Sequence, residues 1–386
     1  MKSSTGQFYI ALNHIRALAI FMVFTWHFTH WGRGGFPVPY DYVPTFFPLS
    51  LLDEGHTGVA LFMTLSGYLF AKLLDGKTID YKAFLWNRAV RLLPLLAVVI
   101  LVIGVGHAVK GESLRAYAVQ IAQGVVLPSL PNGGWSLTTE FHYYLILPVL
   151  LWMIRKSKWW LLWIIGAAVG LRWLILLGHG EVQRLAYWTM IGRIDQFVLG
   201  MLLFQCRAFV ARRHVLAIGI LSAFALFYWH FDFHGGLYHN PSYPSPSPLW
   251  IFFTTIEGLA YAIGIAWYDS SFSPADAGVS RVIGRIGEYS YSLYVLHFFM
   301  VSQAAVFVHE RMMDISDFPL ACAWALICFL LLVPAGYLSY RFIEAPFLKL
   351  RTRYITVVST EQRAEDVLPS RRAPIGVQGE GVGGCR

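Results

Sequence analysis

The sequence predicts an all-α polytopic membrane protein with about ten transmembrane helices. Of its 386 residues, 56% are hydrophobic and only 13% are charged, and the mean hydropathy is +0.54. Soluble domains carry about 45–50% apolar and about 25% charged residues, so this chain has too little polar surface for a soluble exterior. Its 14 Trp and 20 Tyr suit the aromatic belts at membrane interfaces.

Apolar segments of membrane-spanning length follow one another along the chain. A spanning helix needs about 20 mostly apolar residues. On this criterion the sequence predicts ten spans: His14–His30, Thr57–Leu74, Leu92–Gly106, Ser136–Met153, Trp159–Leu177, Tyr187–Cys206, His214–Phe231, Leu249–Tyr268, Ile286–Val308 and Leu320–Tyr340. The segment Ala116–Leu127 is expected to be re-entrant or interfacial. Residues 1–347 would form one membrane domain, and the polar residues 348–386 a disordered cytoplasmic tail.

Basic residues are concentrated in alternate connections between these spans. The connections that share a side with the N-terminus hold these clusters: Lys72, Lys77, Lys82, Arg88 and Arg91; Arg155, Lys156 and Lys158; Arg207, Arg212 and Arg213; Arg281 and Arg285; Arg341, Lys349, Arg351 and Arg353. The opposite connections carry fewer basic residues, of which Arg33 is one. The positive-inside rule then places both termini in the cytoplasm. It also accounts for the net charge of +8 without a nucleic-acid partner.

Ionisable residues recur inside the predicted spans, where they are expensive and usually functional. In the predicted orientation most lie in the outer half of the membrane, which favours a polar cavity open to the outside. Trp135 and Ser136 begin the span that carries two of them. The candidate cavity residues are Trp135, Ser136, Glu140, His142, Arg172, Arg193, Asp195, Glu257 and His297, together with His27. The alternative is that pairs such as Arg193–Asp195 only neutralise each other between helices.

A second set of cations lies at the inner ends of the spans. Arg88 and Arg91 are three residues apart and share a helix face. Arg16 precedes His27 by eleven residues, about three turns or roughly 16 Å, so both lie on one face of the first helix. An anionic substrate could enter beside the arginines and reach His27, which suits general-base chemistry near neutral pH. The alternative is that these arginines only extend toward anionic headgroups.

Several segments together resemble the acyltransferase-3 family of integral membrane acyltransferases. The segment "IRALAIFMVFTWHF" resembles its first helix, in which an Arg precedes a His by eleven positions. The later segments "GHTGVALFMTLSGYLF", "RAVRLLP", "WSLTTEFHYYLILP", "RIDQFVLGMLL", "GEYSYSLYVLHFF" and "RFIEAPF" resemble its other landmarks. All seven occur in order between residues 8 and 347.

The resemblance implies transfer of an acyl group, usually acetyl, from cytosolic acyl-CoA to a hydroxyl of an extracytoplasmic or lipid-linked glycan. The enzyme would be an O-acyltransferase integral to the cell membrane. His27 corresponds to the catalytic base, with Glu140 supporting the active centre. Arg88 and Arg91 correspond to contacts with the CoA phosphates, and Arg16 to the donor channel.

One position departs from the family pattern. Many relatives carry an acid, two residues after the Gly of the second-helix motif, that is thought to pair with the His; here that residue is Ala60. Either another acid, such as Asp53, Glu54 or Glu140, orients His27, or the base works without such a partner. Ser66 in "LSGY" could form an acyl-enzyme, although a small residue for helix packing is the simpler interpretation.

Two other classes of function fit parts of the sequence. A transporter or flippase for a glycan or solute would use the same polar cavity without making bonds. A b-type cytochrome could take axial ligands from His27, His142 and His297. No metal site is expected, because His230, His234 and His239 lack the spacing of a known site, and the four Cys form no disulfide framework.

Overall fold

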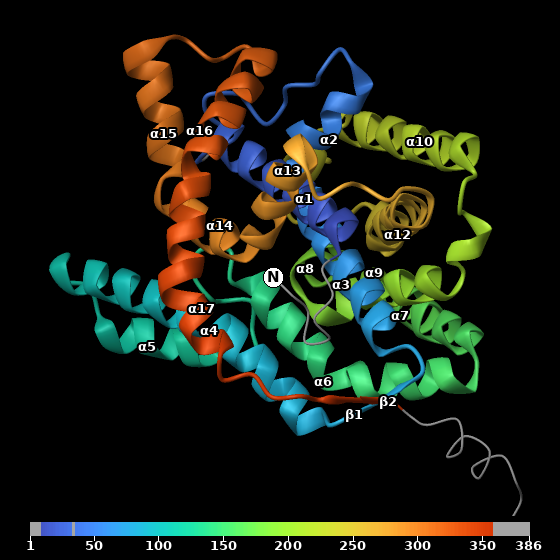
Figure 1. Ribbon diagram of the computed structural model, residues 1–386. Coiled ribbons are helices and arrows are strands. Elements are labelled where there is room, and N and C mark those ends of the chain that lie inside the picture. Colours follow the sequence, from blue (N-terminus) through green and yellow to red (C-terminus); the bar gives the residue numbers. More distant parts are fainter. Residues whose placement is uncertain (1–8, 33–34, 358–386) are drawn as a thin grey trace, which may run out of the picture.

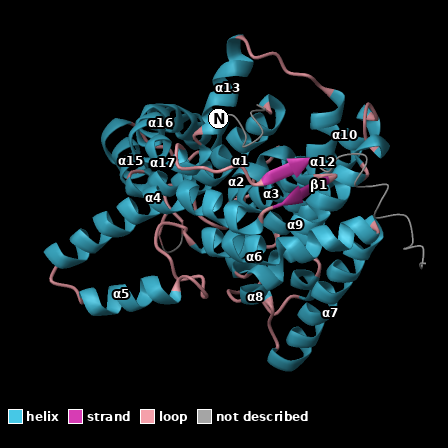
Figure 2. Ribbon diagram, turned by 60° about the horizontal axis from the view of Figure 1, so that its bottom comes forward, coloured by secondary structure: helices cyan, strands magenta, loops and turns pink. Residues whose placement is uncertain are grey.

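The computed structural model describes residues 9–32 and 35–357, and these form a helical bundle with one small strand pair (Figures 1 and 2). Its α-helices are α1 (Ile10–Thr29), α2 (Ser50–Asp53), α3 (Gly58–Leu74), α4 (Tyr81–Val109), α5 (Leu114–Gln123), α6 (Trp135–Lys156), α7 (Leu161–His179), α8 (Gln183–Trp188), α9 (Met190–Gln205), α10 (His214–Phe233), α11 (Gly236–His239), α12 (Phe253–Ser271), α13 (Gly278–Glu288), α14 (Ser290–Leu296), α15 (Val301–Phe307), α16 (Phe318–Ser339) and α17 (Ala345–Leu348). Strand β1 (Lys77–Ile79) pairs antiparallel with β2 (Ile355–Val357). The all-α prediction is confirmed.

The centre of the bundle is built on α3, which packs against α1, α9 and α12. A Cβ atom added at Gly67 of α3 would lie 1.9 Å from the carbonyl oxygen of Phe197, and one added at Gly200 of α9 would lie 2.1 Å from that of Thr64. Glycine on both helices therefore lets the two backbones meet without intervening side chains, as small residues do in membrane bundles. In the "LSGY" segment, the small residue at this helix contact is therefore Gly67, the neighbour of Ser66.

The peripheral helices present apolar side chains outward. Leu101 of α4, Trp163 of α7, Val215 of α10 and Leu331 of α16 are all largely exposed. The C-terminal half of α4 and the antiparallel α5 project from the bundle in both views (Figures 1 and 2). A soluble protein would bury such side chains, whereas lipid solvates them. The arrangement is that of a multi-pass membrane protein.

The number of spans differs from the prediction of ten. In the described part of the chain, seven helices are long and apolar enough to cross a membrane, or eight if the bent pair Ser290–Phe299 and Val301–Met312 forms one span. Helices α9 and α12 occupy two of the ten predicted spans but are not among the helices that are long and apolar enough to cross a membrane. Helix α9 has only 16 residues. Both helices are largely buried by other helices and carry charged side chains, so neither has the pattern of a lipid-facing span. The cytoplasmic placement of the termini stays a prediction.

The segment predicted to be a disordered tail begins inside the fold. Residues 348–357 are described: Leu348 ends α17, Tyr354 is buried, and Ile355–Val357 form β2. Strand β2 lies beside β1 at the foot of α4 and α6 (Figure 1). The remainder of the predicted tail, 358–386, lies outside the described residues.

Candidate active site

Helix α1 carries the two residues that the sequence placed on one face. It runs without a break from Ile10 to Thr29, so Arg16 and His27 share one rigid element. The Arg16 guanidinium donates to Asn13 Oδ1 at 2.7 Å, and His27 Nδ1 lies 2.8 Å from the carbonyl oxygen of Val23. Because a carbonyl oxygen can only accept, Nδ1 must carry the proton. In the neutral imidazole the other ring nitrogen, Nε2, is then unprotonated and available as a base.

Arg16 lines a cavity of about 180 Å³ that we call the arginine cavity. Four arginines from three parts of the chain reach it. The residues that matter for its chemistry are Arg16, Arg88, Arg91, Arg351, Glu140, Glu288, Ser66, Ser136, Tyr144, Tyr294 and Tyr354. The predicted shared face of Arg88 and Arg91 is therefore present on α4. A site with this many guanidinium groups is suited to an anionic ligand, above all a phosphate.

Arg88 is half-buried against two aromatic rings. Its guanidinium lies 5.4 Å from the ring centroid of Phe70 and 5.7 Å from that of Phe84. Its Nε is buried and, in the described part of the chain, has no hydrogen-bond partner. Buried polar groups usually have partners, so an orphaned donor beside a cavity points to a ligand or water that completes it.

Glu140 also faces the arginine cavity, from helix α6. It accepts a short hydrogen bond from the hydroxyl of Tyr144, one turn further along the helix and in the same cavity. Ser136, one turn earlier, donates to the hydroxyl oxygen of Tyr294 at 2.8 Å. The turn before α6 requires Gly133, whose φ is +69° and whose added Cβ would lie 2.8 Å from the ring of Phe298.

Tyr294, one of the residues that line the cavity, lies close to a pair of imidazoles. The Tyr294 ring lies 5.8 Å from that of His297, which in turn lies 5.1 Å from that of His27. His297 is fully buried, and its Nδ1 lies 2.6 Å from the carbonyl oxygen of Tyr294. Phe298 packs edge-on against His27 at 4.5 Å. His27 itself is half-buried and is not among the residues that line the cavity.

The three acids considered as partners of His27 are engaged elsewhere. Asp53 contacts His30 at 3.0 Å, Glu54 contacts His56 at 2.7 Å, and Glu140 bonds to Tyr144. Within the described ranges none of them is hydrogen-bonded to His27, whose ring is oriented by the α1 backbone instead.

His56, in the "GHTG" part of the second-helix segment, also lies near His27. Its ring lies 5.7 Å from that of Trp26, which is 4.8 Å from that of His27. The ring of Trp26 therefore lies between His27 and the acid–imidazole pair Glu54–His56.

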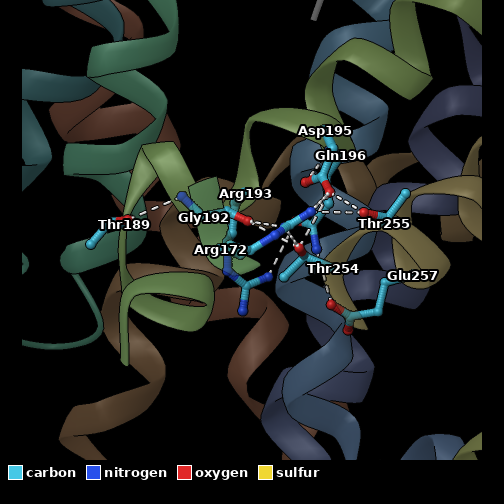
Figure 3. Close-up of polar contacts among 9 residues, drawn as sticks. All are labelled: Arg172, Thr189, Gly192, Arg193, Asp195, Gln196, Thr254, Thr255 and Glu257. Atoms are coloured by element: carbon cyan, nitrogen blue, oxygen red, sulfur yellow. Dashed lines mark hydrogen bonds and ion pairs between the residues drawn. The ribbon is translucent and has the colours of Figure 1, made fainter. Parts of the chain in front are cut away.

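Arg172, Arg193, Asp195 and Glu257 belong to a buried polar network (Figure 3), and none of them lines the arginine cavity. Arg172 and Asp195 are fully buried and 2.7 Å apart. Arg172 also donates to the carbonyl oxygen of Gly192 at 2.7 Å and to both Thr254 and Thr255. The alternative pairing of Arg193 with Asp195 is not formed, because residues two apart on a helix lie on different faces, and Asp195 pairs with Arg172 instead.

Arg193 and Glu257 lie beside this pair. Arg193 lies 4.4 Å from the ring centroid of Tyr187 and donates to Gln196 at 3.2 Å. Gln196 bridges onward to Glu257 at 2.9 Å, and Glu257 also accepts from Thr57 and Tyr228. Each charge has several partners in a packed setting, as expected for groups that join helices.

Two further candidates have contacts of a structural kind. Trp135 packs against Tyr187 and Trp188 and lies 5.3 Å from Arg193. His142 lies 2.9 Å from the carbonyl oxygen of Val125, in the connection after α5. Neither lines the arginine cavity.

Residues 9–32 and 35–357 contain no group of three or more His, Cys, Asp or Glu side chains arranged to hold a metal. The rings of His27 and His297 are in direct contact, which leaves no gap for a haem between them.

Arg351 is the arginine of the cavity that sequence reasoning missed. It lies in the segment predicted to be a disordered tail, 260 residues after Arg91 in the chain. No local pattern marks it, since it is one of several basic residues in a polar segment.

Comparison with known proteins identifies the chain's relatives. The family model for the acyltransferase domain of acyltransferase-3 proteins matches residues 9–337. The chain is 26% identical over 383 residues to proteins of Staphylococcus aureus strains COL, MSSA476 and N315 that carry the provisional name O-acetyltransferase. The match covers 88% of this chain but only 57% of each relative, so the chain spans just over half their length. No solved structure matches significantly. The family match over most of the chain shows that this protein belongs to the acyltransferase-3 family of membrane acyltransferases.

Proposed function

We propose that the protein transfers an acetyl group from acetyl-CoA, bound at the arginine cavity, to a hydroxyl of an extracytoplasmic or lipid-linked glycan. The observation that carries this proposal is the convergence of four arginines on one cavity, of which one lining residue, Tyr294, lies 5.8 Å from the ring of His297, itself 5.1 Å from that of His27. The guanidinium groups would bind the donor phosphates. The thioester would then lie toward Tyr294, and the acceptor would approach His27 from the opposite side.

His27 is the proposed general base. Its Nε2 would take the proton of the acceptor hydroxyl while the hydroxyl oxygen attacks the thioester carbonyl, and the proton would then pass to the departing CoA thiolate. The bond from the carbonyl carbon to sulfur breaks as the bond to the acceptor oxygen forms. The Val23 carbonyl holds the ring in the required tautomer, so this step needs no paired acid at position 60.

Glu140 has a supporting role in this scheme. It lies in the cavity with Tyr144 and on the same helix as Ser136. From there its carboxylate would help to position the donor between the arginines and Tyr294. Ser66 and Ser136 also face the cavity, so an acyl-enzyme on a serine is the alternative route for the same overall transfer.

The arginine end of α1 is proposed to face the cytosol, where acyl-CoA is found. The basic connections identified in the sequence follow the positive-inside rule in that orientation. The acceptor would then be reached from the other face of the cell membrane. An acetyl group agrees with the names of the staphylococcal relatives, which specify O-acetyl transfer. The glycan acceptor is proposed from the family resemblance.

Binding of radiolabelled acetyl-CoA to the detergent-purified protein tests this proposal. The double variant Arg88→Ala/Arg91→Ala should lose binding, because both guanidinium groups line the cavity. The control Arg281→Ala, an exposed side chain paired with Asp276, should bind like the wild type. If the folded wild-type protein shows no specific binding, the acyl-CoA proposal fails and transport of a glycan or solute becomes the leading hypothesis.

A further inference from the structure

The segment Leu350–Val357, which we call the C-terminal strap, is fastened across the start of α4. Trp86 Nε1 donates to the carbonyl oxygen of Leu350 at 3.0 Å. The fully buried Asn87 makes two hydrogen bonds to the backbone of Thr352, donating to its carbonyl oxygen at 2.7 Å and accepting from its N–H at 2.9 Å. A buried amide bonded in both directions fixes the register of the segment that it holds.

The rest of the strap is held by backbone pairing and by one aromatic contact. The N–H of Asp80 donates to the carbonyl oxygen of Tyr354 at 2.9 Å, and β2 continues as the partner of β1, with Thr356 opposite Thr78. The Tyr354 side chain is buried, packs 5.5 Å from the ring of Phe84 and lines the arginine cavity. The strap is therefore a wall of the cavity.

These attachments determine where Arg351 points. The residues on either side of it are bonded to α4 through their backbone groups, and its own side chain enters the arginine cavity beside Arg88 and Arg91. Burial, together with those two neighbouring guanidinium groups, lowers the pKa of Arg351 to about 10, so it remains a cation at neutral pH. Arg353, two residues further along the strap, is exposed and does not line the cavity.

The charged side chains that line the cavity carry a net positive charge. Four arginines line it, against the two carboxylates of Glu140 and Glu288. Glu288 also bonds to Arg285 at 2.7 Å, and a third carboxylate, Glu344, lies outside the lining and is hydrogen-bonded to Ser292. Cations crowded into a partly buried site repel one another unless an anion joins them. A multiply charged phosphate ligand would remove that repulsion.

We propose that Arg351 is a phosphate-binding residue of the donor site and that the C-terminal strap completes this site by holding Arg351 in place. This inference rests on the proposed acyl-CoA function. The C-terminal strap, which follows the "RFIEAPF" segment in the chain, would then take a direct part in donor binding. Asn87 acts through the strap and is a positioning residue.

The experiment compares Arg351→Ala with the matched control Arg353→Ala, both in the full chain. Equilibrium binding is measured with acetyl-CoA, which carries phosphates, and by competition with acetyl-pantetheine, which carries none. Arg351→Ala should weaken acetyl-CoA binding roughly 10- to 100-fold, the range for loss of one hydrogen bond to a charged group. It should leave acetyl-pantetheine binding unchanged, and Arg353→Ala should match the wild type with both ligands.

Different failures have different meanings in this design. If the wild type itself does not bind acetyl-CoA, the proposed function fails. If the wild type binds acetyl-CoA and Arg351→Ala binds it equally well, the proposed role of Arg351 in donor binding is wrong. Equal weakening with both ligands would show that Arg351 only supports the fold, and this also overturns the inference.

An anionic lipid headgroup is the other source of phosphate for this arginine. The same measurements are made in nanodiscs of phosphatidylcholine alone and in nanodiscs with phosphatidylglycerol. If the wild-type and Arg351→Ala proteins differ only when phosphatidylglycerol is present, the residue holds lipid and not donor. A difference of the same size in both membranes supports the donor assignment.

Discussion

The pair Arg172–Asp195 offers the sharpest test of the distinction between structural and catalytic charges. Both side chains are fully buried and 2.7 Å apart, and Arg172 has further partners in Gly192 and in Thr254 and Thr255. Arg172→Ala would leave the Asp195 carboxylate buried without its cation. Removal of one member of a buried pair costs about 3–5 kcal/mol, whereas replacement of both by apolar residues is often neutral. The double variant Arg172→Met/Asp195→Leu should therefore recover part of the stability lost in Arg172→Ala.

The assay measures thermal unfolding in detergent. Unfolding is monitored by the labelling of Cys328, whose side chain is buried in the folded protein and becomes reactive when the protein unfolds. The control is Arg281→Ala, which removes an exposed ion pair with Asp276 worth about 0–1 kcal/mol. If Arg172→Ala unfolds at the same temperature as this control yet has lost activity, the network is part of the catalytic machinery and the structural interpretation is wrong.

Three further predictions concern the site and the helix packing. His27→Ala should lower the turnover rate about 10²- to 10⁴-fold while acetyl-CoA binding, measured directly, stays intact; unchanged turnover would exclude His27 as the base. Glu140→Gln should lose activity at normal expression, and full activity in that variant would exclude a role for the carboxylate. Gly67→Ala should destabilise the protein by about 1–3 kcal/mol, because its Cβ would lie 1.9 Å from the carbonyl oxygen of Phe197. Gly166→Ala, with open space around the added Cβ, is its control and should unfold like the wild type.

Local periodicity was sufficient to predict part of the site. Arg16 and His27 are on one helix, as are Arg88 and Arg91, and the cavity lining includes the three arginines of these pairs. Helical geometry fixes which residues share a face, so such pairs can be predicted from spacing alone. Glu140 and Ser136, one turn apart on α6, follow the same rule.

Pairings between helices could not be predicted in this way. Asp195 pairs with Arg172 of another helix and not with the nearby Arg193. Ten spans were expected because hydropathy treats every apolar segment alike. Helices α9 and α12 are enclosed by other helices, so burial by protein takes the place of lipid and allows shorter, more polar sequences.

The sequence by itself determined the class of the protein, the family and the chemical character of the site. Composition requires a membrane, and seven ordered motifs specify the acyltransferase-3 family, because both are properties of residues close together in the chain. Only the tertiary structure decided that Arg351 joins Arg88 and Arg91 at one cavity, and that His297 of the C-terminal half meets His27 of α1. Such contacts depend on how helices and strap pack across hundreds of residues, and no local pattern encodes that packing.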